Sequence, residues 1–146
     1  MKISFRHFMK SILFHCKEFN ANITGLSTRG VEVAPEKVFK NNDDYQNCVV
    51  AFITVEAADN IESITPSAAK EIEKFCLETK ENTVVLCPFA HLSNKLAPFK
   101  IGISFFDQLE NLLKGKFTVG RTHFGSDKEL LMRLFGHPGN VRYREF

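Results

Sequence analysis

The stretch Val84-Val85-Leu86-Cys87-Pro88-Phe89-Ala90-His91-Leu92-Ser93 constrains the fold more than any other part of the chain. Its apolar beginning, with two β-branched side chains, is typical of a strand that is buried on both faces. Pro88 cannot continue a central ladder, so the chain must leave the sheet there. In open α/β sheets ligands bind beyond the carboxyl ends of the strands, where His91 and Ser93 would lie. The same pattern also fits a histidine that only caps the end of the strand.

The first half of the chain predicts further strands. We expect a strand over 11–16 and a weaker one over 29–39, which Pro35 interrupts. The polar residues 40–44 have the composition of a turn. The apolar run from Cys48 to Val55 predicts the strongest strand of the protein. Together these segments indicate an antiparallel hairpin whose second strand is central in the sheet.

Two helices follow from apolar periodicity. Thr65-Pro66 has the residue types of a helix start, with a capping threonine and a proline at the first helical position. The helix predicted over 66–79 has apolar residues at Ala68, Ala69, Ile72, Phe75 and Cys76. A second helix is predicted over 97–113, with a core-facing stripe formed by Ile101, Phe105, Phe106, Leu109, Leu112 and Leu113.

The C-terminal third predicts a short strand over 116–121 and an ambiguous segment over 126–135. Intrinsic propensity favours a helix for the latter, because Lys, Glu, Leu and Met all prefer one. With 146 residues, the chain suits one compact α/β domain in which a mixed sheet is covered by two helices. Four cysteines without C-x-x-C spacing indicate buried free thiols in a reducing cytoplasm. Neither a membrane-spanning apolar run nor a metal-ligand pattern is evident in the sequence, and we expect no metal and no cofactor.

The charge is unevenly distributed. Seven basic and three acidic side chains lie in residues 114–146, although the whole chain carries a net charge of only +2. A basic segment of this kind suits a polyanion such as RNA. A solvated basic face is an equally good interpretation of this pattern.

Candidate polar residues are His15 at the end of the first predicted strand, His91, His123, His137 and Lys128. Lys128 lies close behind the glycine turn at 125, where a solvated lysine is the ordinary expectation. No phosphate-binding loop, dinucleotide fingerprint or nucleophile elbow is present in the sequence.

Several of these motifs, in this order, resemble the N-terminal editing domain of archaeal threonyl-tRNA synthetases. The resemblance rests on Val50-Ala51-Phe52-Ile53-Thr54-Val55-Glu56, on Pro88-Phe89-Ala90-His91-Leu92-Ser93, on Phe124-Gly125 before Lys128, and on Gly136-His137-Pro138. It covers roughly residues 9–140, so residues 1–8 resemble an extension ahead of an editing domain at 9–146. The resemblance implies the fold of D-aminoacyl-tRNA deacylases. It also implies a strand at 126–135, and we follow it because tertiary pairing commonly overrides propensity.

The resemblance implies hydrolysis of mischarged seryl-tRNA(Thr), either by a free-standing protein or by the N-terminal domain of a synthetase. The matching positions place Lys128 near the ester, His91 beyond the strand and Val55 beside the adenosine. The remaining predicted binding residues are Pro88, Phe89, Ala90, Asp127 and His15. The implied partners are the tRNA 3′ end, a second copy of the chain in a homodimer, and the catalytic part of a threonyl-tRNA synthetase.

The chain departs from the family pattern in three places, at four positions. Asp127 replaces an aromatic residue, Val141 replaces a glutamate, and Cys16-Lys17 follows His15 where the family favours Ser-Asp. Two alternative functions stay open at this point. One is a tRNA-binding or structural domain that has lost its activity, and the other is a D-aminoacyl-tRNA deacylase.

Overall fold

The computed structural model describes residues 9–26 and 42–146. Six strands and two helices follow one another in these ranges: β1 (Lys10–Leu26), β2 (Asn42–Thr54), α2 (Ile61–Thr79), β3 (Thr83–Pro88), α3 (Phe99–Leu113), β4 (Thr118–Arg121), β5 (Ser126–Leu134) and β6 (Val141–Glu145). Their order confirms the predicted α/β domain with two helices and a strand at 126–134. The candidate strand at 29–39 and the extension at 1–8 lie outside the described residues.

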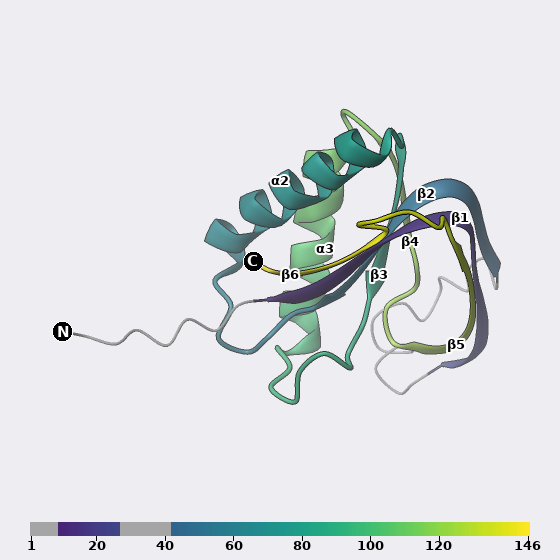
Figure 1. The fold of residues 1–146 in the computed structure, drawn as a ribbon. Coiled ribbons are helices and arrows are strands. Elements are labelled where there is room, and N and C mark those ends of the chain that lie inside the picture. Colours follow the sequence, from purple (N-terminus) through teal and green to yellow (C-terminus); the bar gives the residue numbers. More distant parts are fainter. Residues whose placement is uncertain (1–8, 27–41) are drawn as a thin grey trace.

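All six strands form one mixed sheet with the order β4-β3-β2-β1-β5 (Figure 1). β6 also pairs with β1, alongside residues 10–14, whereas β5 pairs with residues 16–26. β1 and β2 are antiparallel, and β3 runs parallel to both β2 and β4. The predicted antiparallel hairpin is therefore confirmed in the pairing of β1 with β2, and β2 is central in the sheet.

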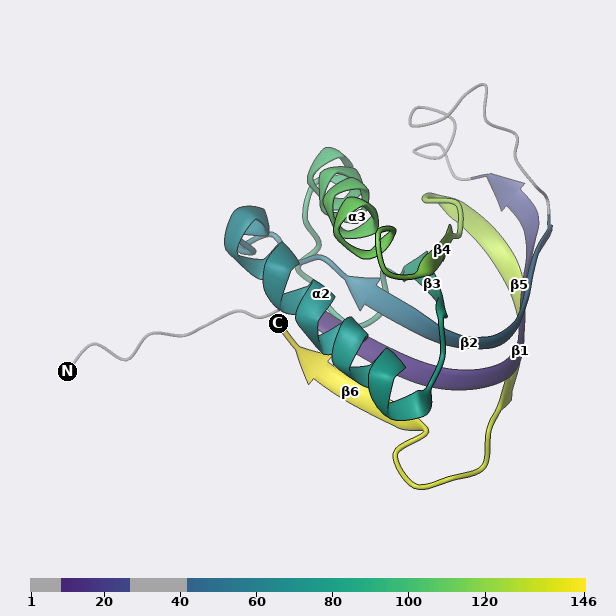
Figure 2. The same ribbon diagram turned by 90° about the horizontal axis from the view of Figure 1, so that it is seen from above.

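Strand β1 is much longer than the predicted 11–16 segment. It continues past His15 because it pairs with β2 as far as Asn22 and with β5 as far as Leu26. An irregularity between Cys16 and Glu18 shifts its register against β5. Figure 2 shows β1 and β2 bending strongly, with β5 at the end of the curve away from α2. The curved sheet therefore buries side chains on both faces.

The two helices pack against one face of this sheet. Their buried side chains join those of β1, β2 and β3 in a core that contains Leu13, Val49, Ile53, Ile72, Phe75, Val84, Leu86, Phe105 and Leu109. A second cluster covers the opposite face and contains Cys16, Phe19, Cys48, Val50, Phe52, Val85 and Cys87. The four cysteines are free and buried, as the sequence predicted.

Both helices differ in detail from the prediction. α2 begins at Ile61 after Asn60, four residues before the predicted start at Thr65, so Pro66 lies inside the helix. Pro66 has no amide to donate to the Glu62 carbonyl, so the helix lacks one internal hydrogen bond there. In α3 the buried stripe is rotated, since Ile101 is 41% exposed whereas Gly102 is buried.

The predicted turn at 40–44 is also wrong in part, because β2 already includes residues 42–44. These residues pair with the far end of β1, where Ala21 opposes Asp43. Polar residues can occupy this part of the strand because long-range pairing satisfies their backbone groups. None of the described helices has the length and apolar character needed to cross a membrane.

Candidate active site

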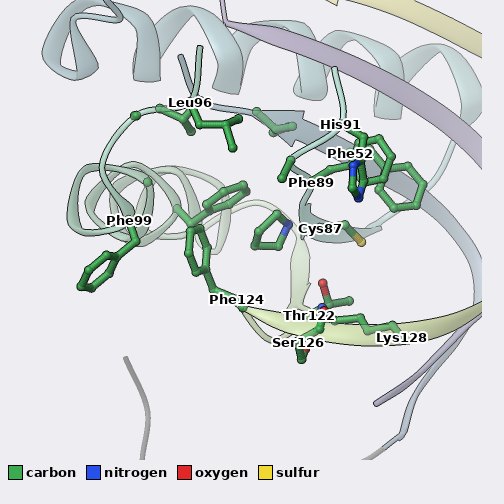
Figure 3. Close-up of a pocket in the computed structure, with 18 of the residues that line it drawn as sticks. Phe52, Cys87, Phe89, His91, Leu96, Phe99, Thr122, Phe124, Ser126 and Lys128 are labelled. Atoms are coloured by element: carbon green, nitrogen blue, oxygen red, sulfur yellow. The ribbon is translucent and has the colours of Figure 1, made fainter. Parts of the chain in front are cut away.

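A cavity of about 530 Å³ lies at the carboxyl ends of three neighbouring parallel strands (Figure 3). Val55 follows β2, Pro88 ends β3 and Thr122 follows β4, and all three residues line the cavity. This is the edge at which the sequence predicted a ligand, because parallel strands bring their carboxyl ends together. The other walls come from the loop after β3, from α3 and from the start of β5.

One half of the cavity is apolar and aromatic. Its lining includes Leu96, Ala97, Phe99, Phe106 and Phe124. Gly102 of α3 lets the helix approach this wall, because a Cβ at that position would lie 3.2 Å from the ring of Phe124. Flat aromatic walls of this kind suit the face of a nucleobase.

Lys128 brings an amine to the other half of the cavity. It is the third residue of β5, and its Nζ donates a hydrogen bond to the Ser126 carbonyl oxygen at 3.2 Å. Burial lowers the pKa of Lys128 below its ordinary value, and nearby Cys87, Asp43 and Asp127 partly oppose that shift. The expected solvated turn lysine is therefore half-buried, because β5 starts pairing with β1 two residues earlier.

Two further polar side chains at this end were not predicted. Cys87 is 2% exposed and Thr122 is 3% exposed, and both line the cavity beside Lys128. Burial raises the pKa of the Cys87 thiol to about 12, although a hydrogen bond from Thr122 and the charge of Lys128 act in the opposite direction. Cys87 is therefore a protonated thiol at neutral pH. In the sequence, the position of Cys87 at the end of the apolar run 84–87 was the feature that could have indicated its place in the cavity.

Asp43 and Tyr45 reach the same region from β2. Asp43 is 8% exposed, and the Tyr45 hydroxyl donates a hydrogen bond to Asp43 Oδ1 at 3.4 Å. Burial, followed by the charge of Asp43, raises the pKa of Tyr45 to about 12. Side chains along β2 alternate between the two faces of the sheet, but Asn47, with a φ of 49°, interrupts this alternation. The pattern of the apolar run therefore does not extend to Asp43 and Tyr45, and sequence reasoning missed both.

The loop that follows β3 forms one wall of the cavity. The rings of Phe89 and His91 meet edge to face, with 4.9 Å between their centroids. His91 is exposed, and so is Asp127 on the opposite side. The structure thus brings together seven predicted residues: Val55, Pro88, Phe89, Ala90, His91, Asp127 and Lys128.

His15 is the exception and lies outside this cavity. Its Nε2 is 2.8 Å from Glu81 Oε2, and its Nδ1 is 2.6 Å from His137 Nε2. Its ring also contacts Phe135, with 4.3 Å between the centroids. β1 does not end at His15, so this side chain faces the loop after α2 and the β5–β6 turn instead of a strand end.

The basic C-terminal segment does not present its charges as one free surface. Lys116 pairs with Glu73, Arg121 pairs with Asp107 and Glu110, and Arg142 and Arg144 pair with Glu78 and Glu71. Acidic side chains of α2 and α3 therefore neutralise most of the excess charge. This arrangement favours neither of the two interpretations of the basic segment as a whole.

The fold is that of a D-aminoacyl-tRNA deacylase-like domain. A solved structure described as a probable eukaryotic D-amino acid tRNA deacylase superposes with a TM-score of 0.66 and 10% identity, covering 96% of this chain and 100% of the other. The c-Myc DNA unwinding element binding protein superposes with a TM-score of 0.68 and 7% identity, covering 94% and 98%. At these identities the similarity concerns the fold alone.

The sequence gives a closer relationship. The model of the archaea-specific editing domain of threonyl-tRNA synthetase matches residues 9–145. This chain therefore belongs to that family of editing domains.

Two relatives illustrate the context of the family. The threonine–tRNA ligase editing subunit of Saccharolobus solfataricus is 36% identical over 128 residues, which is 87% of this chain and 32% of the relative. The threonine–tRNA ligase of Hyperthermus butylicus is 32% identical over 137 residues, which is 89% of this chain and 21% of the relative. The chain thus spans at most about a third of the length of these relatives.

Proposed function

We propose that this chain hydrolyses the ester bond of mischarged seryl-tRNA(Thr). Serine lacks one methyl group of threonine, and a difference of that size discriminates by only about 1–3 kcal/mol in a binding pocket. A synthetase for threonine therefore needs a second site that removes serine. Membership of the editing-domain family and the placement of the cavity support this function.

The observation that carries the proposal is the half-buried amine of Lys128 opposite an aromatic wall in one cavity. The terminal adenosine would lie against the aromatic half and Val55. The seryl group would lie near Lys128, between the backbone of residues 88–90 and His91. Water attacks the ester carbonyl carbon, and the bond to the ribose oxygen breaks to release serine and a free ribose hydroxyl.

The chemistry needs positioning and stabilisation of the charge that grows on the ester oxygen, and an ammonium group provides such stabilisation. A 2′-hydroxyl of the tRNA would assist in handling the proton, as the family resemblance implies. The one thiol among the described lining residues, that of Cys87, stays protonated at neutral pH because burial raises its pKa to about 12. This arrangement is consistent with water as the attacking group.

The test is hydrolysis by the purified chain of three substrates: seryl-tRNA(Thr), threonyl-tRNA(Thr) and a D-aminoacyl-tRNA. We expect release of serine and little release of threonine. Preference for the D-aminoacyl substrate would favour the D-aminoacyl-tRNA deacylase alternative. Absence of hydrolysis together with retained tRNA binding would favour a domain that has lost its activity.

We further propose that the chain acts in the cytoplasm on tRNA, as a homodimer, and in association with the catalytic part of a threonyl-tRNA synthetase. Support for a dimer comes from β6, where Arg142 and Arg144 face α2 and the alternate residues Val141 and Tyr143 face the other side. These two side chains are 44% and 48% exposed. Light scattering at micromolar concentration should give twice the chain mass, and a value near 16.6 kDa would contradict the dimer.

A further inference from the structure

A buried carboxylate lies behind the wall of the cavity. Glu56 follows Val55 at the end of β2 and is 3% exposed. Its Oε1 accepts a hydrogen bond from the Lys10 ammonium, and its Oε2 accepts one from the Ser93 hydroxyl at 2.8 Å. Both carboxylate oxygens therefore have partners that are distant in sequence. A buried charge is tolerated only with such partners.

Ser93 transmits this anchorage to the loop. Its Oγ donates to Glu56 and also accepts the backbone N–H of Lys95 at 3.0 Å. The backbone around Glu56 pairs with the same loop, since Ala57 N–H donates to the Lys95 carbonyl at 2.8 Å and Ala97 N–H donates to the Val55 carbonyl at 3.0 Å. Glu56 and its neighbours thus hold the second half of the loop.

Thr54 holds the first half of the loop in a similar way. Its hydroxyl donates to the Phe89 carbonyl oxygen and accepts the backbone N–H of Leu92 at 3.3 Å. Residues 89–98 form no helix or regular strand, apart from one isolated bridge between Glu56 and Leu96. The position of Ala90 and His91 therefore depends on two polar side chains at the end of β2.

We propose that Glu56 is a positioning residue that fixes the 89–96 wall of the cavity through Ser93. It does not line the cavity that contains Lys128, whereas Ala90, His91 and Leu96 of the anchored loop do. Loss of the anchor lets this wall move, so that substrate binds less tightly while the reacting groups are retained. The effect on catalysis rests on the proposed function, but the anchorage itself does not.

The kinetic test uses Ser93→Ala, which removes the link and leaves the ion pair between Lys10 and Glu56. Hydrogen bonds to charged groups are stronger than those between neutral groups, so the loss of this one should loosen the wall. We expect KM for seryl-tRNA(Thr) to rise about tenfold with kcat nearly unchanged, and Ser93→Thr to restore it. Ser63→Ala is the matched control, since the exposed Ser63 donates only to a nearby backbone carbonyl at the start of α2.

A double-mutant cycle assigns the effect to Glu56. Glu56→Gln removes the charge and should raise KM to a similar extent, whereas combining it with Ser93→Ala should add little. If the double variant raised KM by the product of the two single increases, the side chains would act independently and the proposal would be overturned. A KM for Ser93→Ala equal to that of Ser63→Ala would also overturn it. This comparison does not depend on whether Glu56→Gln folds.

A measurement without substrate separates this proposal from the proposed function. The amide protons of Ala57 and Ala97 bond the loop to β2 without using either mutated side chain. We expect their hydrogen exchange to accelerate at least tenfold in Ser93→Ala and to stay unchanged in Ser63→Ala. Unchanged exchange in Ser93→Ala would refute the anchorage. An inactive parent protein with accelerated exchange in the variant would refute only the proposed function.

Discussion

Replacing Lys128 with methionine removes the ammonium group from the cavity while keeping a side chain of similar length. In the structure this ammonium makes one hydrogen bond, to the Ser126 carbonyl at 3.2 Å, and burial already disfavours its charge. Methionine gains apolar burial and loses that bond. The free energy of unfolding should therefore change by less than about 1 kcal/mol.

The rate should respond far more strongly than the stability. Removal of one preorganised donor that stabilises developing charge costs about 10²–10³ in rate. Single-turnover hydrolysis of seryl-tRNA(Thr) by Lys128→Met should fall by that factor. Lys70→Met, at an exposed position on α2, serves as the control and should match the parent.

Two outcomes would refute this reasoning about Lys128. A variant that deacylates within threefold of the parent rate would show that the ammonium does not act on the ester. A loss of several kcal/mol in unfolding free energy would show that the lysine is structural. Urea unfolding followed by circular dichroism, run beside the kinetics, distinguishes these two cases.

Three further predictions follow from the same region and from the core. The Asp43 carboxylate favours the charged form of Lys128, so Asp43→Asn should lower the pKa of Lys128 further. The loss of hydrolysis at alkaline pH should then begin at a lower pH, and an unchanged pH profile would contradict this. Gly120→Ala should destabilise the protein by about 1–3 kcal/mol, because its Cβ would lie 2.3 Å from the Tyr45 hydroxyl, and the penalty should largely vanish in a Tyr45→Ala background. Burial raises the pKa of all four cysteine thiols from 9.0 to about 12, so their contribution to stability is complete below pH 9 and is lost as the pH rises toward 12. Urea titrations should show a fall approaching about 1.4 kcal/mol per pH unit per thiol, and equal stability at pH 8 and pH 10.5 would refute it.

The sequence by itself determined the features that depend on local pattern. The apolar runs at 48–55 and 84–87 specify buried strands, and the 3.6-residue stripes specify two helices, because burial selects these periodicities wherever the elements pack. Pro88 ends its strand, which places residues 88–91 at the carboxyl edge of the sheet and hence in the cavity. Lys128 is a candidate from the residues alone, but its place on a strand near the ester came from the family resemblance, since propensity alone favours a helix for its segment.

Only the tertiary structure decided which distant polar groups meet. Pairing with β2 and β5 carries β1 past His15, and Asp43 and Tyr45 of β2 come to lie near Lys128 and Cys87. Acidic residues on the helices take up most of the C-terminal basic charge, and Glu56 finds partners 46 and 37 residues away in Lys10 and Ser93. Such contacts depend on strand register and sheet curvature, which the packing of the whole domain sets, and no local pattern in the sequence encodes them.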